Sequence, residues 1–204
     1  LQTPRERLDL PHPVLLLLLY HIQLLGNLFA FIIPDSVICS KYQDTLAGSP
    51  GSRPPCLLAC FNIEFRQGET MIIALIQMRV SPDKLQNLRR VEELVKESAA
   101  NGADLIILPE MFCCEYHDSA FIENRESVGG LIWQTLSRVA AENTAWLIGG
   151  SMPETDGGHT YNTSFVFDRT GKQVAFHRKL HLFDIDVKGG QHFRESHIFS
   201  AGDD

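Results

Sequence analysis

The stretch LPEMFCCEY, residues 108–116, places a carboxylate close to two thiols. Glu110 precedes Cys113 and Cys114 by three and four residues. A carboxylate that takes the proton of a nearby thiol produces a nucleophile that can attack an amide or ester carbon. Two interpretations of this loop are open: it is a complete thiol–carboxylate site, or it is one part of a site whose other residues lie elsewhere.

Lys179 is a second candidate, because it lies among apolar residues in HRKLHLFD, residues 177–184. A lysine in this setting either extends its ammonium past an apolar stem to solvent or is held inside as a fixed positive charge. His177 and His181 flank it at the spacing of one strand face. No set of ligands stands at metal-binding spacing around them, so we expect ordinary packing or hydrogen bonding for both histidines.

The elements that must position these residues alternate between strand and helix after residue 70. Short apolar runs predict buried strands, and apolar residues at helical spacing predict two helices. The β-α-β order implies parallel strands with a right-handed crossover, and therefore an α/β layered fold. The predicted elements are strands over 71–80, 103–110 and 145–153, helices over 81–102 and 129–144, and a strand pair over 160–179 that turns at 168–171.

Both predicted helices have one apolar face. Ser81 or Asp83 can cap the first helix, and Gly102 ends it. The residues expected to face the core are Leu85, Leu88, Val91, Leu94, Val95 and Ala99 in the first helix, and Leu131, Leu136, Val139 and Ala140 in the second.

The position of Glu110 is compatible with a functional role. In open α/β sheets, ligands bind at the carboxyl ends of the strands, and Glu110 ends the predicted strand over 103–110. Lys179 ends the second strand of the predicted pair. Position alone does not separate Glu110 from a solvated loop carboxylate.

Composition excludes several classes of protein. The 204 residues are 44% hydrophobic and 21% charged, as in a globular protein, with a net charge of −7. This charge argues against a nucleic-acid surface or a polybasic membrane surface. The five cysteines are odd in number and irregular in spacing, so we expect no disulfide framework and a reducing compartment. Cys56 and Cys60 lack a matching pair of ligands for zinc.

Residues 1–70 differ in character from residues 71–204, and we divide the chain between them. The apolar run 14–33 is long enough to span a bilayer, but polar residues interrupt it and no clear cleavage site follows. It is interpreted as a targeting or anchor sequence, as an apolar helix of the fold, or, as we favour, as upstream sequence that is not native structure. Residues 46–56 are typical of a Pro/Gly/Ser linker. The chain starts with Leu and ends at Asp204 without a closing element, so we expect a fragment.

Four segments in order, LPEMF, WLIGGSMPE, YNTSFVFDRTG and HRKLHLFDID, resemble the nitrilase (carbon–nitrogen hydrolase) superfamily. Within it, GGSMPE, YNTSFVF and RKLHLFDIDVKGGQHFRES are most similar to the omega-amidase branch, whose members hydrolyse amides of short dicarboxylic acids. The resemblance covers residues 71–204 and nothing in 1–70. It implies a four-layer α-β-β-α sandwich, of which this chain would hold only the N-terminal portion.

The resemblance also assigns roles. Glu110 is the expected general base and Lys179 the expected stabiliser of the oxyanion. Glu195 matches a second glutamate that supports the lysine, the alternative being an ordinary surface charge. The nucleophilic cysteine of the family follows a later strand and would lie beyond Asp204. The resemblance therefore implies that the two neighbouring cysteines at 113 and 114 are pocket-wall or buried thiols.

The implied activity is hydrolysis of the amide of a small omega-amidodicarboxylic acid through a thioester, with no cofactor and no metal. We expect the substrate to be a small omega-amide carboxylic acid and the complete protein to form a homodimer. We expect no nucleic-acid partner and no membrane association. The expected compartment is the cytoplasm, with mitochondrial or plastid targeting open. The isolated chain is expected to be inactive and poorly folded. The alternative is a truncated, non-catalytic product of the same fold that binds a partner or a small carboxylate.

Overall fold

The computed structural model describes residues 56–64, 70–188 and 192–203. Most of the predicted extension 1–70, including the apolar run 14–33, lies outside the described residues, and so does Asp204. In the part of the chain that is described, no helix has the length and apolar character needed to cross a membrane. The elements in chain order are β1 (Cys56–Glu64), β2 (Thr70–Met78), α2 (Lys84–Ala100), β3 (Leu105–Ile107), α3 (Asp118–Asn124), α4 (Leu131–Asn143), β4 (Trp146–Ile148), β5 (Met152–Asp156), β6 (His159–Phe167), β7 (Gln173–Arg178), β8 (Asp184–Asp186), β9 (His192–Arg194) and the 3-10 turn η3 (Glu195–His197).

The predicted α/β order is confirmed. Strand β2 pairs in parallel with β3, and β3 pairs in parallel with β4. The seven-stranded sheet has the order β1-β2-β3-β4-β6-β5. Strand β7 is outside this order and also pairs with β6. The predicted strand pair is β6 and β7, which are antiparallel. In their turn, Asp168 accepts hydrogen bonds from the backbone N–H groups of Thr170 and Lys172.

One predicted strand is two strands in the structure. The apolar run over 145–153 divides into β4 and β5, which both pair with β6. The division falls at Gly150, whose φ of +58° is left-handed and cannot continue a strand.

Strand β1 was not predicted. It lies at the sheet edge and pairs with β2 in an antiparallel register from Cys56 opposite Met78 to Glu64 opposite Thr70. Strand β1 lies on the N-terminal side of the division at residue 70 and pairs with the sheet formed by the residues after it. The Pro/Gly-rich sequence immediately before Cys56 is typical of a linker, and for this reason the sequence predicts no strand here.

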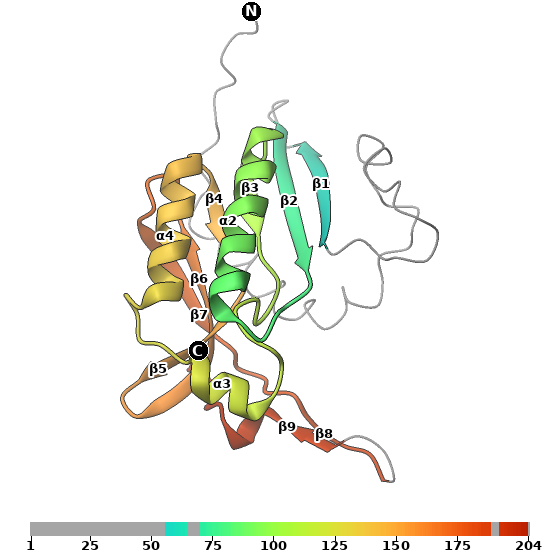
Figure 1. Ribbon diagram of the computed structural model, residues 1–204, viewed down its shortest axis with the longest axis vertical. Helices are drawn as coiled ribbons and strands as arrows, with labels where there is room; N and C mark the ends of the chain where they lie inside the picture. Colours follow the sequence, from blue (N-terminus) through green and yellow to red (C-terminus); the bar gives the residue numbers. More distant parts are fainter. Residues whose placement is uncertain (1–55, 65–69, 189–191, 204) are drawn as a thin grey trace, which may run out of the picture.

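Helices α2 and α4 lie side by side on one face of the sheet (Figure 1). Asp83 caps α2 by accepting hydrogen bonds from the N–H groups of Leu85 and Gln86. The predicted apolar faces are largely confirmed, but Leu85 and Leu131 are 50% and 45% exposed. Both line a groove between the two helices. Ile132, next to Leu131, is fully buried instead.

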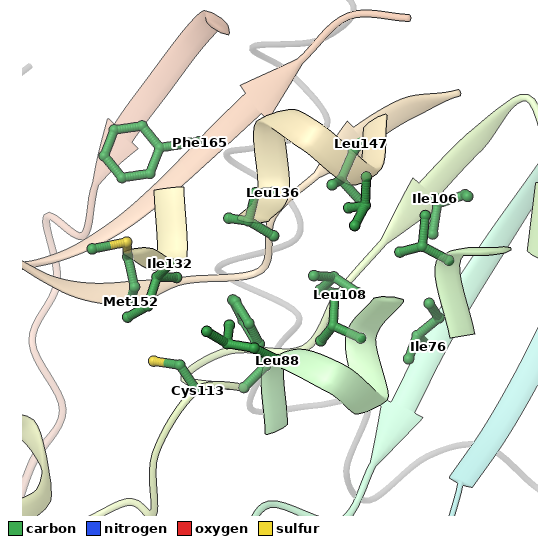
Figure 2. Close-up of a cluster of buried hydrophobic side chains, with 14 of the residues drawn as sticks. Ile76, Leu88, Ile106, Leu108, Cys113, Ile132, Leu136, Leu147, Met152 and Phe165 are labelled. Carbon is green, nitrogen blue, oxygen red and sulfur yellow. The ribbon is translucent and has the colours of Figure 1, made fainter. Parts of the chain in front are cut away.

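Apolar side chains are buried on both faces of the sheet. The larger cluster fills the space between the sheet and the helices (Figure 2) and includes Leu88, Ile106, Leu136 and Phe165. A second cluster on the opposite face contains Met71, Ile73, Leu105, Ile107, Trp146, Ile148, Val166 and Ala175. The described residues thus form one helix layer on a seven-stranded sheet, and β8 and β9 pair in a second, two-stranded sheet. The helix layer and the larger sheet correspond to one α and one β layer of the α-β-β-α sandwich that the resemblance implies.

Candidate active site

Glu110 lies in the loop that follows β3. Hydrogen bonds join this loop to β4 and to the loop that follows β4. Leu108 donates its backbone N–H to Ile148 at 3.0 Å, and Met111 donates its N–H to the Ser151 hydroxyl at 3.1 Å. Met111 has a left-handed φ of +49°. Parallel strands end at the same edge of the sheet, so these bonds fix where Glu110 projects.

Gly150 allows this close approach. A Cβ at position 150 would lie 2.1 Å from the carbonyl oxygen of Pro109, the residue before Glu110. We expect Gly150→Ala to destabilise the full-length protein by about 2–4 kcal/mol, because backbone must move as well as adopt a strained φ. Gly157 is the matched control, since its φ is +56° but a Cβ there would meet nothing within 4 Å. Gly157→Ala should cost about 1 kcal/mol. Equal losses in urea unfolding would contradict the clash at Pro109.

Lys179 is buried immediately after β7, with 6% of its surface exposed. Its backbone N–H donates to Asn162 at 2.9 Å, and its carbonyl accepts from Gly202 at 3.0 Å. Its ammonium lies 3.0 Å from both Glu110 Oε1 and Glu195 Oε1. Of the two interpretations of this lysine, the structure supports the fixed internal charge.

Glu195 is the first residue of η3 and is fully buried. Its Oε1 accepts from Lys179, and its Oε2 accepts from the backbone N–H of Phe183 at 2.6 Å. Its own N–H donates to the Phe183 carbonyl at 3.1 Å. The alternative of a surface charge at Glu195 is therefore wrong.

Glu110, Lys179 and Glu195 are brought together from three separate segments, and two residues that were not predicted join them. The Tyr116 hydroxyl contacts Oε1 of both Glu110 and Glu195. The Asn162 side chain donates to Glu110 Oε1 at 2.8 Å. Both belonged to quoted segments, LPEMFCCEY and YNTSFVF, but neither residue type stands out in a loop or strand.

Opposing effects set the protonation of the site. Burial alone would lower the pKa of Lys179, but the neighbouring Glu110 and Glu195 carboxylates raise it above its ordinary value. Burial and the same two carboxylates raise the pKa of Tyr116 far above its ordinary value. At neutral pH the lysine is therefore charged and the tyrosine carries its proton.

Cys113 and Cys114 are buried in the core, with exposures of 0% and 2%. Figure 2 shows Cys113 among the apolar side chains beneath the helices. The hydrogen bond with Cys114, together with burial, raises the pKa of the Cys113 thiol. The same bond lowers the pKa of Cys114 against the effect of burial. Buried thiols are confirmed, and no described hydrogen bond joins either one to Glu110 or Lys179.

The position of the nucleophile stays a prediction. The family resemblance implies a cysteine beyond Asp204, and the described residues end at 203. The residues to which the resemblance assigns the other roles, Glu110, Lys179 and Glu195, all lie within the described part of the chain.

Two further sequence predictions concern the histidines that flank Lys179 and the binding of a metal ion. Burial lowers the pKa of His177, as expected of a packed, neutral imidazole. Among the described residues, no three His, Cys, Asp or Glu side chains are grouped so as to hold a metal ion.

Comparison with known proteins gives a consistent result. Residues 72–204 match the family described as carbon-nitrogen hydrolase. The chain is 47% identical to omega-amidase NIT2 of Mus musculus over 134 residues, which cover 66% of this chain and 49% of that protein. It is 45% identical to omega-amidase NIT2 of Homo sapiens over 131 residues, which cover 64% and 48%. The chain spans about half the length of these curated relatives.

Solved structures agree with the sequence relatives. Saccharomyces cerevisiae Nit3, a member of branch 10 of the nitrilase superfamily, aligns with a TM-score of 0.53 and 31% identity, over 61% of this chain and 45% of that one. An amidase from Nesterenkonia sp. aligns with a TM-score of 0.55 and 25% identity, over 66% and 49%. With a family match over residues 72–204 and the fold of these neighbours, the chain belongs to the carbon–nitrogen hydrolase family.

Proposed function

We propose that the full-length protein hydrolyses the amide of a small omega-amidodicarboxylic acid to the acid and ammonia through a thioester intermediate. The observation that carries this proposal is the buried contact of Lys179 with Glu110 and Glu195. Curated relatives that are 45–47% identical are named omega-amidases, which supports the choice of substrate class.

The two oxygens of Glu110 are in different situations. Oε1 accepts hydrogen bonds from Asn162, Lys179 and Tyr116. No described residue donates to Oε2. One oxygen therefore anchors the carboxylate while the other is available to take a proton, as a general base requires.

Glu195 differs from Glu110 because described groups occupy both of its oxygens. A proton on Glu195 would weaken these bonds, because a neutral carboxyl group is a poorer acceptor than a carboxylate. The role of Glu195 is to hold the lysine. The Lys179 ammonium has three N–H groups, and the two carboxylates accept two of them. The third is free to bind an oxyanion, with a positive charge already fixed in place.

The reaction needs a thiol that Cys113 and Cys114 are poorly placed to supply. We place the nucleophile beyond Asp204, in the second half of the domain, as the resemblance implies. The thiol proton passes to Glu110 while sulfur attacks the amide carbon, and the oxyanion forms beside Lys179. Collapse transfers the proton to the leaving nitrogen and releases ammonia. Glu110 then takes a proton from water as that water attacks the thioester carbon. When the second intermediate collapses, the C–S bond breaks, the proton passes from Glu110 to sulfur, and the acid and the thiol are freed.

Ammonia release from the monoamides of succinic and glutaric acids tests the proposal directly. We expect the full-length protein to hydrolyse them faster than a neutral amide or a nitrile of equal length. Equal rates with the neutral amide would exclude the proposed substrate class. No hydrolysis of any of these compounds would favour the non-catalytic alternative.

We expect residues 1–204 alone to release no ammonia, because the resemblance implies that the nucleophile and the rest of the sandwich follow Asp204. Full-length protein assayed at the same concentration is the control. Turnover by residues 1–204 that Cys113→Ser or Cys114→Ser abolishes would contradict the placement of the nucleophile. It would make one of these thiols catalytic instead.

A further inference from the structure

Tyr116 connects the two carboxylates of the site independently of Lys179. Its hydroxyl lies 3.3 Å from Glu110 Oε1 and donates to Oε1 of Glu195. A tyrosine hydroxyl has one hydrogen to donate, so the two carboxylates compete for it. The same two oxygens share the Lys179 ammonium.

Ring contacts fix the position of this hydroxyl. The Tyr116 ring packs edge-on against Phe121 of α3 at 5.1 Å between centroids, and it packs against Phe193 of β9 at 5.6 Å. Phe121 is fully buried. Tyr116 as a whole is 41% exposed, so these contacts hold one side of its ring rather than enclose it. Because they come from two separate elements, they keep the hydroxyl beside both carboxylates without help from substrate.

We propose that Tyr116 is a positioning residue for Glu110, whose hydroxyl alternates its hydrogen bond between Glu110 and Glu195 as Glu110 gains and loses a proton. This inference rests on the proposed function, because it assigns a proton to Glu110 during the reaction. It adds a residue that the family resemblance did not assign.

The physical reason is charge balance. The charged groups that face the hydroxyl in the described structure are Glu110, Glu195 and Lys179, two negative and one positive. While Glu110 is anionic, a hydrogen bond from Tyr116 favours the charged form. Once Glu110 holds the thiol proton, the hydroxyl donates to Glu195, which keeps its negative charge. A fixed donor such as Asn162 cannot make this change.

Tyr116→Phe in the full-length protein tests the proposal, because phenylalanine keeps the ring contacts and removes only the hydroxyl. We expect kcat to fall about tenfold and KM to stay within about a factor of two. Losing a donor makes protonation of the base easier, so the acid limb of kcat/KM should move to higher pH by roughly half a unit or more.

Tyr161→Phe is the matched control. The Tyr161 ring lies under the Arg178 guanidinium at 4.0 Å, and phenylalanine keeps that ring. No described hydrogen bond joins the Tyr161 hydroxyl to Glu110 or Glu195. We expect its kcat and pH profile to match the wild type. A rise in KM at constant kcat in Tyr116→Phe would mean that Tyr116 binds substrate, and an unchanged pH profile and kcat would mean that it does nothing for Glu110. Either outcome overturns the proposal.

Tyrosinate absorbance gives a readout that does not need activity. The carboxylates and burial keep the Tyr116 proton in place, so the folded wild type and Tyr116→Phe should show the same tyrosinate steps on titration up to about pH 11. Loss of a step in Tyr116→Phe would show that the hydroxyl is not held between two carboxylates. If the wild type hydrolyses no amide, the proposed function fails, while this titration still tests whether burial and the two carboxylates hold the proton on the Tyr116 hydroxyl.

Discussion

Glu110→Gln is expected to reduce kcat/KM for amide hydrolysis by about 10³-fold or more in the full-length protein. A carboxamide has the size of the carboxylate and can still accept from Asn162 and Lys179 through its oxygen. It cannot take the thiol proton, and general-base catalysis is worth about 10²–10⁴-fold. Both half-reactions use the same base, so acylation and deacylation should slow together. Ammonia release in steady state and in a single turnover measures the two effects.

Glu126→Gln is the control for this substitution. Glu126 is also a partly buried glutamate paired with a lysine, Lys84, at 2.7 Å. It accepts from the backbone N–H of Ile132 in α4, so its loss should affect stability rather than activity. We expect wild-type kcat/KM for Glu126→Gln. If Glu110→Gln kept more than a tenth of wild-type activity, Glu110 would not be the base.

Local sequence patterns predict the elements because burial repeats at the spacing of each element. Leu88, Val91, Leu94 and Val95 are buried as their helical spacing predicts. The prediction of burial is wrong for Leu85 and Leu131. Each lies in the first turn of its helix, where its side chain lines the groove between α2 and α4. Periodicity indicates which face is apolar, but it does not indicate where the neighbouring element ends.

The site residues could not be predicted in the same way. Glu110 and Lys179 are 69 residues apart, and no local pattern signals their contact. From the residues alone, a lysine that reaches solvent is the favoured interpretation of Lys179, and an ordinary surface charge is an open alternative for Glu195. Only the resemblance over several segments selected them. Tyr116 and Asn162 depend on three-dimensional neighbours and were missed for that reason.

Lys179→Ala is expected to have two effects that can be separated. The first is on catalysis, because the oxyanion loses its fixed charge, at a cost of about 10²–10³-fold in kcat. The second is on stability, because the fully buried Glu195 loses its ammonium partner. Removing one member of a buried ion pair costs about 3–5 kcal/mol.

The pH dependence of this stability has a definite sign. The pKa of Lys179 is raised in the folded protein, so the contribution of the ion pair is fully present at neutral pH. It is lost only as pH rises through the folded-state pKa, above the ordinary lysine value of about 10.5. Urea unfolding at pH 7 should therefore show the full deficit of Lys179→Ala.

The double substitution Lys179→Ala with Glu195→Gln separates the two effects, because the neutral amide does not need a cation. We expect it to recover a large part of the stability that Lys179→Ala loses, and none of the activity. Recovery of both would mean that Lys179 acts only by neutralising Glu195. Recovery of neither would mean that the bond from the Phe183 N–H to Glu195 needs the negative charge, and that the lysine and η3 are held together by the carboxylate itself.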